Sequence, residues 1–333
     1  MKIIVDTKGG DNSASEFVKG GLIALQEHSD LELIYVGFKN EIIEALDGNK
    51  DPRISILDAS EVVTNDDQPT SAIRNKKDSS LVKGLELLKS DAKSDAFVTS
   101  GNTGATLFGS MTKVGRMANV DRAALAPILP TQIPNKYTCL IDSGANVDCK
   151  PEQLGQFAIM GSCYMKSSFG IKNPTVALVS VGVEDKKGNE QTKEAFQILK
   201  TLPINFVGNM EAREALSGNY DVLVCDGFIG NVLLKSIEGT AMMVGGMLKH
   251  SLVKHMPADI DPTFLKKSFG EVMSLLDFNA HGGAPLLGVE KIVMKVHGAS
   301  NHMAIAAAIR QVKQLLDGNL IETTKELISK VYS

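Results

Sequence analysis

Residues 96–104 read Ala-Phe-Val-Thr-Ser-Gly-Asn-Thr-Gly, an apolar run followed by a glycine loop. Ala96–Thr99 is a short apolar run, typical of a strand that is covered on both faces. The loop that follows combines glycine with small polar residues, and an amphipathic helix is predicted over Thr103–Val114. A buried strand that runs through a glycine loop into a helix is the repeating unit of a parallel α/β sheet.

The same unit recurs along the chain. Further strands are predicted at Lys2–Asp6, Leu31–Val36, Ile54–Asp58, Tyr137–Asp142, Thr175–Val181, Ile204–Gly208, Val222–Asp226 and Ile292–His297. Further helices are predicted at Ser15–Gln26, Glu41–Leu46, Ser80–Ser90, Pro151–Phe169, Asn189–Leu199 and Ser300–Asp317. The alternation predicts an open, mostly parallel, doubly wound sheet, and we expect residues 1–333 to form a single α/β domain.

Residues 229–278 break this alternation. Their pattern predicts two consecutive helices. The helices are divided near Pro257 and Pro262, because proline cannot continue a helix interior. We therefore expect a helical hairpin inserted in the α/β fold. Its methionines and phenylalanines allow two interpretations: a surface for a dimer, a partner or a membrane, or ordinary packing against the sheet.

Composition excludes several classes of protein. Lysine and arginine number 35 against 39 aspartates and glutamates, and the net charge of −4 argues against a protein that coats nucleic acid. Aromatic residues make up 5% and tryptophan is absent, so stacking on bases is not expected. No stretch reaches the roughly 18 apolar residues of a membrane span. The first six residues, Met1–Asp6, do not have the pattern of a signal peptide.

The cysteines are widely spaced and form no CxxC pair: Cys139, Cys149, Cys163 and Cys225. This spacing does not indicate a zinc cluster, and a chain of this size needs no disulfide framework. We therefore expect the protein to be located in the reducing cytoplasm.

Glycine with asparagine, aspartate, serine or threonine follows six predicted strands, at Asp6–Asp11, Ser100–Gly104, Asp142–Asn146, Gly182–Glu190, Asp226–Asn231 and His297–Asn301. Ligands bind at the carboxyl ends of the strands in a doubly wound sheet, so we expect these loops in register along one sheet edge. Glycine lets backbone amides approach a ligand, and a helix N-terminus adds positive charge. The pattern predicts an anion-binding cleft, although a single Gly-Asn pair also simply turns a chain.

Several familiar sites are absent from the sequence. There is no GxGxxG after a strand, no GxxxxGK[ST] and no GxSxG, so neither NAD, an ATP P-loop nor a serine hydrolase is indicated. Asp142, Asp148 and Asp226 could bind a hard cation, but loop hydrogen bonding and helix capping are the favoured interpretation.

Taken together, the motifs resemble one family, the phosphate acyltransferases of bacterial phospholipid synthesis. The matching stretches are Ala72–Arg74 with Lys76 and Asp78–Ser80, Ser100–Ala105, Asp121–Arg122 with Ala124–Pro127, Gly144–Pro151, Gln156–Gly161, Lys187–Glu190, Cys225–Phe228 with Gly230–Asn231, and Gly282–Gly288. The likeness runs from about residue 2 to residue 312. The chain departs from the family pattern in three places. Asn12, at the end of the first loop, stands where the family has histidine, and Ser143 stands where it has valine. Residues 180–184 read Ser-Val-Gly-Val-Glu, where the family often has Asn-Ile-Gly followed by threonine or glutamate and a further glutamate.

The resemblance implies an αβα sandwich similar to phosphate acetyltransferases and to the isocitrate and isopropylmalate dehydrogenases. It implies transfer of a fatty acyl group from acyl carrier protein to inorganic phosphate, which gives acyl phosphate. It also implies a homodimer that needs no metal or organic cofactor and associates with the membrane surface.

The matching motifs supply candidate site residues. We expect Ser100, Asn102 and Thr103 to bind phosphate. The other substrate-binding candidates are Gly101, Gly104, Asp142, Asn146 and Gly283. Neutral donors and close backbone amides of this kind can hold an anion and stabilise the oxyanion of a tetrahedral intermediate.

The catalytic candidates are Lys187, Asn189, Asp226, Asn231 and His297. Lys187 with Asn189 would supply charge and stabilise the oxyanion, while Asp226 and Asn231 would orient the reactants. His297 is a candidate general base, although phosphate is already partly dianionic. Alternatives stay open: Lys187 as a solvated lysine and Asp226 as a helix cap. Covalent catalysis by Cys149 or Cys225 is disfavoured, since the sequence places no activating partner beside either thiol except Lys150.

Acyl carrier protein is acidic, so its docking surface should be basic, and the candidates are Arg74, Lys76, Lys77, Arg116 and Arg122. The candidate membrane contact is the hairpin tip, at Leu252, Val253, Met256 and Ile260. Three other functions compete: a phosphate acetyl- or butyryltransferase that uses coenzyme A, an inactive scaffold that binds the carrier protein, and a dehydrogenase of the related fold.

Overall fold

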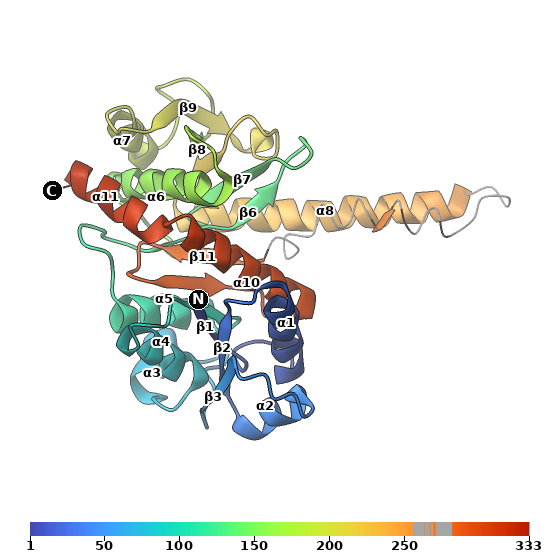
Figure 1. Ribbon diagram of the computed structural model, residues 1–333. Helices are drawn as coiled ribbons and strands as arrows, with labels where there is room; N and C mark the ends of the chain where they lie inside the picture. The colour runs from blue at the N-terminus through green and yellow to red at the C-terminus, as the bar shows by residue number, and fades with distance from the viewer. Residues whose placement is uncertain (256–262, 264–266, 268, 271–281, 333) are drawn as a thin grey trace.

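Two β-sheets form the frame of the molecule. The computed structural model describes residues 1–255, 263, 267, 269–270 and 282–332, and within them the strands form a 7-stranded and a 5-stranded sheet (Figure 1). The larger sheet has the order β3-β2-β1-β4-β12-β11-β5. Its strands are β1 (Lys2–Asp6), β2 (Glu32–Gly37), β3 (Ile54–Asp58), β4 (Ala96–Thr99), β5 (Ala124–Leu125), β11 (Ala284–Leu287) and β12 (Ile292–Lys295).

The smaller sheet has the order β6-β7-β10-β8-β9. Its strands are β6 (Ile128–Pro130), β7 (Tyr137–Ile141), β8 (Thr175–Ser180), β9 (Asn205–Glu211) and β10 (Val222–Val224). Among the described strands, antiparallel pairing is confined to β11 with its two neighbours and to β6 with β7. The mostly parallel character is therefore confirmed, but the expectation of one continuous sheet is wrong.

Helices cover these sheets. They are α1 (Ala14–Glu27), α2 (Lys39–Leu46), α3 (Pro69–Asn75), α4 (Ser80–Ser90), α5 (Thr103–Gly109), α6 (Pro151–Phe169), α7 (Glu190–Leu199), α8 (Gly227–His255), α10 (His302–Asp317) and α11 (Leu320–Tyr332). The predicted helix from Thr103 differs in its second half, because a π-helical turn, η1 (Ser110–Val114), follows α5. A short 3-10 turn, η2 (Ala212–Glu214), follows β9.

The larger sheet is covered on both faces. Side chains alternate along a strand, and Ile3 and Val5 of β1 share a core with Phe17 of α1. Ile4 points the other way, into a core that includes Leu85 of α4. The near-continuous apolar run of β1 follows from this double burial, which is the arrangement that a doubly wound sheet requires.

Helix α6 joins the two sheets. Its buried residues Phe157 and Met160 belong to the same core cluster as Ile3 of the larger sheet and Val222 of the smaller one. Within that core the side-chain amide nitrogen of Gln311, on α10, donates a hydrogen bond of 2.6 Å to the Tyr164 hydroxyl. The sheets therefore share one continuous apolar interior.

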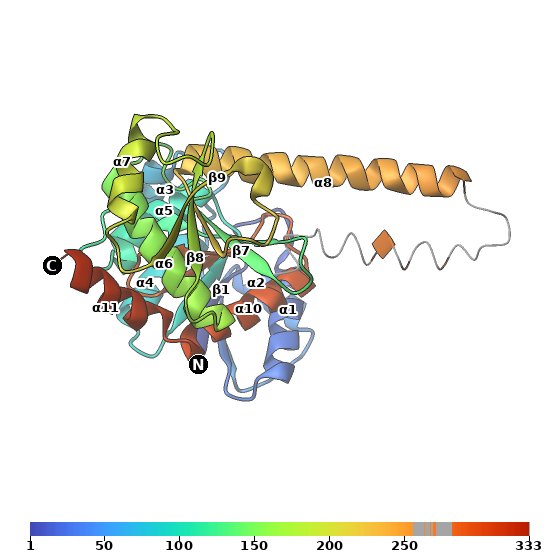
Figure 2. The same cartoon turned by 90° about the horizontal axis from the view of Figure 1, so that it is seen from above.

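Helix α8 extends away from the body of the molecule (Figures 1 and 2). Its range covers the first arm of the expected hairpin, and the hairpin itself stays a prediction. Most of the second arm, with Met256, Pro257, Ile260 and Pro262, lies outside the described residues, although residues 263, 267 and 269–270 are helical. Among the described residues, no helix is both long enough and apolar enough to cross a membrane.

Candidate active site

The six glycine loops come from both sheets. Three follow β1, β4 and β12 of the larger sheet, and three follow β7, β8 and β10 of the smaller one. The expectation of a single sheet edge is therefore wrong, since an apolar strand has the same sequence pattern whichever sheet it joins.

A cleft of about 330 Å³ brings several of these loops together. The larger sheet contributes Thr103, Gly283 and His297, and the smaller sheet contributes Ser143 and Gly144. One face of α8 closes it with Asn231, Leu234, Lys235 and Glu238. Four of the predicted site residues thus line one cleft: Thr103, Asn231, Gly283 and His297.

The opposite face of α8 borders a second cavity of about 400 Å³. Two further predicted residues, Asn189 and Asp226, line it together with apolar side chains such as Val181 and Ile229. The first turns of α8 therefore separate the predicted catalytic residues into two groups. Asn231 faces the first cleft, and Asp226 and Asn189 face the second cavity.

The loop after β4 is packed against the loop after β1. A Cβ atom at Gly9 would overlap the backbone of Gly101, so only glycine allows this approach. The Thr99 hydroxyl accepts a hydrogen bond from the Gly101 amide at 2.9 Å and donates one to the Asp6 carboxylate at 2.7 Å. Burial raises the pKa of Asp6 above its usual range.

Of the predicted phosphate-binding residues in the β4 loop, Thr103 is exposed on the cleft, while Ser100 and Asn102 are buried behind it. The Asn102 side-chain oxygen accepts a hydrogen bond from the Ala105 amide at 2.9 Å and so caps α5. Its amide nitrogen donates to the Thr64 carbonyl at 3.2 Å. Gly101 is buried and Gly104 half-buried beside them.

Asp142 supports its loop from within. Its side chain is fully buried, and its carboxylate accepts hydrogen bonds from the backbone amides of Leu125, Gly144, Ala145 and Asn146 and from the Asn146 side chain. Burial raises its pKa despite these donors. Asn146 also donates to the Ala123 carbonyl at 2.8 Å. Both predicted substrate-binding residues therefore lie beneath the surface and shape the loop that carries Ser143 and Gly144.

Two predicted catalytic residues are helix caps. The Asn189 side-chain oxygen accepts a hydrogen bond from the Thr192 amide at 2.9 Å, at the start of α7. The Asp226 carboxylate accepts one from the Ile229 amide at 2.8 Å, at the start of α8. Capping was the alternative for Asp226, and the structure shows that interaction. Lys187 is exposed, and its ammonium has no partner among the described residues.

Asn231 and His297 are exposed in the cleft. Asn231 lies over Gly144, where an added Cβ would sit 3.6 Å from the asparagine Cβ. The His297 Nδ1 accepts a hydrogen bond from the Ala299 amide at 3.2 Å. Gly283 donates its amide to Gln311 at 2.9 Å, which holds the start of β11 against α10.

The four cysteines are free thiols. Burial raises the pKa of Cys149 to about 12, and the pKa of Cys225 is raised well above its usual range for the same reason. A thiolate is the nucleophilic form of cysteine. The geometry therefore supports the expectation against covalent catalysis. Among the described residues, no group of histidine, cysteine and carboxylate side chains could hold a metal ion.

Sequence reasoning missed Lys295, which also lines the cleft. It ends β12, and its ammonium donates hydrogen bonds to the carbonyls of Ser100, at 3.1 Å, and Val296. Burial lowers the pKa of Lys295 to about 8. The signal that could have found it is a lysine inside the apolar run Ile292–His297. Burying an ammonium is costly unless hydrogen bonds or an opposite charge stabilise it, so a lysine in a buried strand indicates a site.

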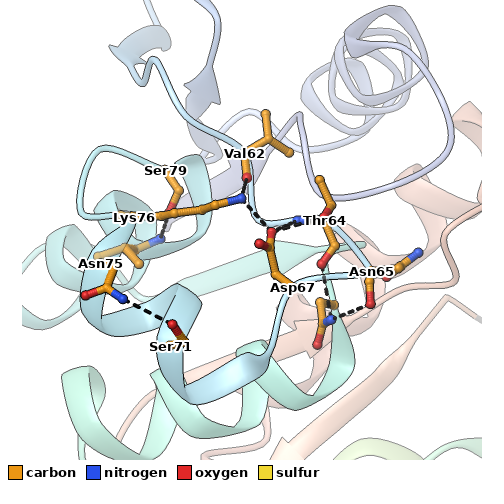
Figure 3. Close-up of polar contacts among 10 residues, drawn as sticks. Val62, Thr64, Asn65, Asp67, Ser71, Asn75, Lys76 and Ser79 are labelled. Carbon is orange, nitrogen blue, oxygen red and sulfur yellow. Dashed lines mark hydrogen bonds and ion pairs between the residues drawn. The ribbon is translucent and has the colours of Figure 1, made fainter.

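The predicted docking surface for the carrier protein is only partly free. The Lys76 ammonium lies 2.6 Å from the Asp67 carboxylate and donates to the Val62 carbonyl at 2.8 Å (Figure 3). Arg116 donates to the Asp121 carbonyl at 2.6 Å. Arg74, Lys77 and Arg122 are exposed, and no ion pair forms at any of these three within the described residues.

The fold defines the class of protein, a mostly parallel, doubly wound α/β protein, and solved structures share it. The chain superposes on a phosphotransacetylase from Streptococcus pyogenes with a TM-score of 0.63 at 16% identity, over 96% of this chain and 94% of that one. A branched-chain phosphotransacylase from Enterococcus faecalis gives a TM-score of 0.55 at 13% identity, over 95% and 100%. At these identities the likeness concerns the fold, and it confirms the predicted fold class.

Sequence comparison then gives the family. The family model described as "Fatty acid synthesis protein" matches residues 1–323. The chain is 42% identical over 331 residues to the phosphate acyltransferase of Thermoanaerobacter pseudethanolicus, covering 99% of this chain and 98% of that protein. It is 42% identical over 330 residues to that of Bacillus cereus, covering 99% of both. The chain belongs to the phosphate acyltransferase family, as the motifs predicted.

Proposed function

We propose that the protein transfers a fatty acyl group from the thioester of acyl carrier protein to inorganic phosphate, which gives acyl phosphate for phospholipid synthesis. The observation that carries this proposal is the identity of 42% to phosphate acyltransferases along almost the whole chain. The relatives of the same fold that act on other acyl groups are far less similar in sequence.

The reaction is an acyl substitution. A phosphate oxygen attacks the thioester carbonyl, a C–O bond forms, and a tetrahedral oxyanion develops. The C–S bond then breaks, and the carrier thiolate leaves and takes a proton from solvent. Holding the two reactants in a near-attack geometry supplies several kcal/mol, and each well-placed donor to the oxyanion about 3–4 kcal/mol.

We place phosphate in the cleft lined by Thr103, Asn231 and His297. Ser100, Gly101, Asn102 and Gly104 shape the β4 loop behind it, and Asp142 and Asn146 hold the facing loop. The exposed Lys187 and the neighbouring Asn189 are proposed to stabilise the developing oxyanion from the other side of the first turn of α8. Asp226 is proposed to fix the start of that helix. No general base is required, because phosphate already carries negative charge, but His297 is exposed and available.

The proposed partners follow from charge and exposure. The acidic carrier protein would dock on Arg74, Lys77 and Arg122. The exposed apolar residues of α8, among them Met243 and Val253, are proposed to contact a second copy of the chain in a homodimer. They are also proposed to contact the cytoplasmic surface of the membrane. No nucleic acid partner, metal or organic cofactor is part of the proposal.

The test is turnover of palmitoyl-loaded acyl carrier protein with inorganic phosphate, followed as free thiol and as acyl phosphate. Palmitoyl-coenzyme A serves as the control donor. Phosphate-dependent thiol release from the carrier protein is the expected result. Release from coenzyme A alone would move the assignment to a coenzyme A-dependent acyltransferase, and binding of the carrier without release would favour the scaffold.

A further inference from the structure

The ammonium of Lys295 is bound by neutral groups and has one hydrogen-bond donor left. An ammonium carries three donors, and two of them are used on the carbonyls of Ser100 and Val296. Within the described part of the chain, no carboxylate lies within ion-pair distance of it. A partly buried cation of this kind is costly unless a further partner compensates it.

The remaining charged side chains of α8 in the cleft neutralise each other. Lys235 and Glu238 form an ion pair of 2.6 Å on the helix that closes the cleft. Lys295 is therefore the lysine without an ion-pair partner among the described residues that line this cleft. Its pKa, lowered by burial and raised in part by Asp6 and Asp11, leaves it protonated at neutral pH.

Ser143 supplies a second candidate donor. The residue lines the same cleft, and its hydroxyl is buried and has no hydrogen-bond partner among the described residues. Buried polar atoms are satisfied in most native proteins, so an unpartnered hydroxyl in the same cleft as an ammonium without an ion-pair partner indicates a ligand that accepts hydrogen bonds. The exposed hydroxyl of Thr103 and the amide of Asn231 lie on the same cleft surface.

We propose that Lys295 and the Ser143 hydroxyl bind the oxygen atoms of inorganic phosphate in this cleft. The assignment rests on the proposed function, since it places the acceptor of that reaction. It adds to the site one residue from the apolar strand β12 and one from the β7 loop. A multiply charged oxyanion supplies both the charge that the ammonium lacks and the acceptors that both groups need.

The test compares Lys295→Met with Lys291→Met. Lys291 directly precedes the same strand, and its ammonium also donates to two carbonyls, those of Asp91 at 2.9 Å and Ser94 at 2.7 Å. It does not line the cleft. We expect K295M to raise the KM for phosphate about tenfold to hundredfold, the equivalent of one hydrogen bond to a charged group. K291M should leave that KM unchanged, and neither variant should alter the KM for the acyl carrier protein donor.

Two further variants keep the proposal open to refutation if K295M does not fold. Ser143→Ala removes only a hydroxyl and should raise the KM for phosphate several-fold. Lys295→Arg keeps the charge and should restore part of the affinity that K295M loses. A wild-type KM for phosphate in both K295M and S143A, or an effect confined to the carrier protein, would overturn the assignment.

Calorimetric titration with inorganic phosphate separates this inference from the proposed function. If the wild-type protein binds phosphate and K295M does not, the assignment holds even where no thiol is released. If the protein turns over carrier-bound donor with phosphate but K295M binds phosphate like wild type, the function stands and the assignment fails.

Discussion

Lys295 makes the phosphate dependence of the reaction sensitive to pH. Its pKa of about 8 lies below the usual lysine value because burial disfavours the charged form, so the ammonium is present below pH 8 and is lost above it. We expect kcat/KM for phosphate, which reports the free enzyme, to fall as the pH rises through about 8. The groups that share its surroundings are Asp6, Asp11 and His297.

A pH series with wild type and Lys295→Arg tests this. Arginine stays protonated throughout this range, so the arginine variant should show a flat kcat/KM for phosphate where wild type declines. An identical decline in both proteins would assign the titration to another group.

Asp142 is expected to matter for stability rather than for substrate affinity. Asp142→Asn places an amide where five N–H donors converge, so at least one donor loses its acceptor. We expect the free energy of unfolding to fall by about 2–4 kcal/mol. The matched control is Asp148→Asn, on the same loop but exposed. Urea denaturation measures both, and a D142N protein of normal stability with a raised KM for phosphate would return Asp142 to the substrate-binding set.

At the scale of secondary-structure elements, variants of the helix cap Asn189 can distinguish a structural role from a catalytic one. Asn189→Ala should cost about 1 kcal/mol of stability, because the Thr192 amide loses its acceptor. Asn189→Ser keeps a capping oxygen and should restore that stability. If the Asn189 amide also stabilises the oxyanion, both variants lose kcat equally. Recovery of kcat in the serine variant would mean that Asn189 acts only as a cap.

The contact between α8 and the β7 loop is equally specific. A Cβ atom at Gly230 would overlap the carbonyl oxygen of Asp142, which is backbone and cannot rotate away. We expect Gly230→Ala to lower the free energy of unfolding by about 1–3 kcal/mol and to lower turnover. Gly239→Ala on the same helix, where no atom of the described residues lies within 4 Å of the added Cβ, should be neutral or stabilising. Equal stability of the two variants would contradict the importance of this contact at the start of α8.

Elements with a strong local pattern were predictable from the sequence. The strands β1, β3 and β4 and the helices α4 and α6 begin and end at the predicted residues. The strands β5 and β6 were missed because they have two and three residues and carry no periodicity. The division into two sheets depends on which strands pair across the chain, and that information is not local.

The candidate site was predictable in part for the same reason. Sequence reasoning found the loops, because glycine and asparagine after a buried strand mark the ligand edge. It could not distinguish Asp142, whose carboxylate accepts hydrogen bonds from backbone amides, from an exposed carboxylate. It also passed over Lys295, since one lysine in an apolar run gains meaning only when the neighbouring strand and helix are in place. The roles of the predicted site residues stay predictions.

At the scale of the whole molecule, the outer part of α8 presents apolar side chains to solvent. Leu252→Glu with Val253→Glu should abolish binding to vesicles of anionic phospholipid, because it places two carboxylates at the proposed contact, while turnover of soluble donor persists. Vesicle sedimentation measures the first and thiol release the second. Val207→Glu, an exposed apolar residue on β9 far from α8 in sequence, is the control. Undiminished vesicle binding by the double variant would contradict the proposed membrane contact.

Helix α8 is rooted in the cleft and projects from the body of the molecule, so it behaves as a lever. Its 29 residues span about 43 Å at 1.5 Å per residue, and a tilt of about 5° at the root sweeps the outer end through about 4 Å. The fulcrum lies where Gly230 packs against the Asp142 carbonyl, directly before Asn231 in the cleft. A surface that holds the outer end therefore also restrains the wall against which phosphate would bind.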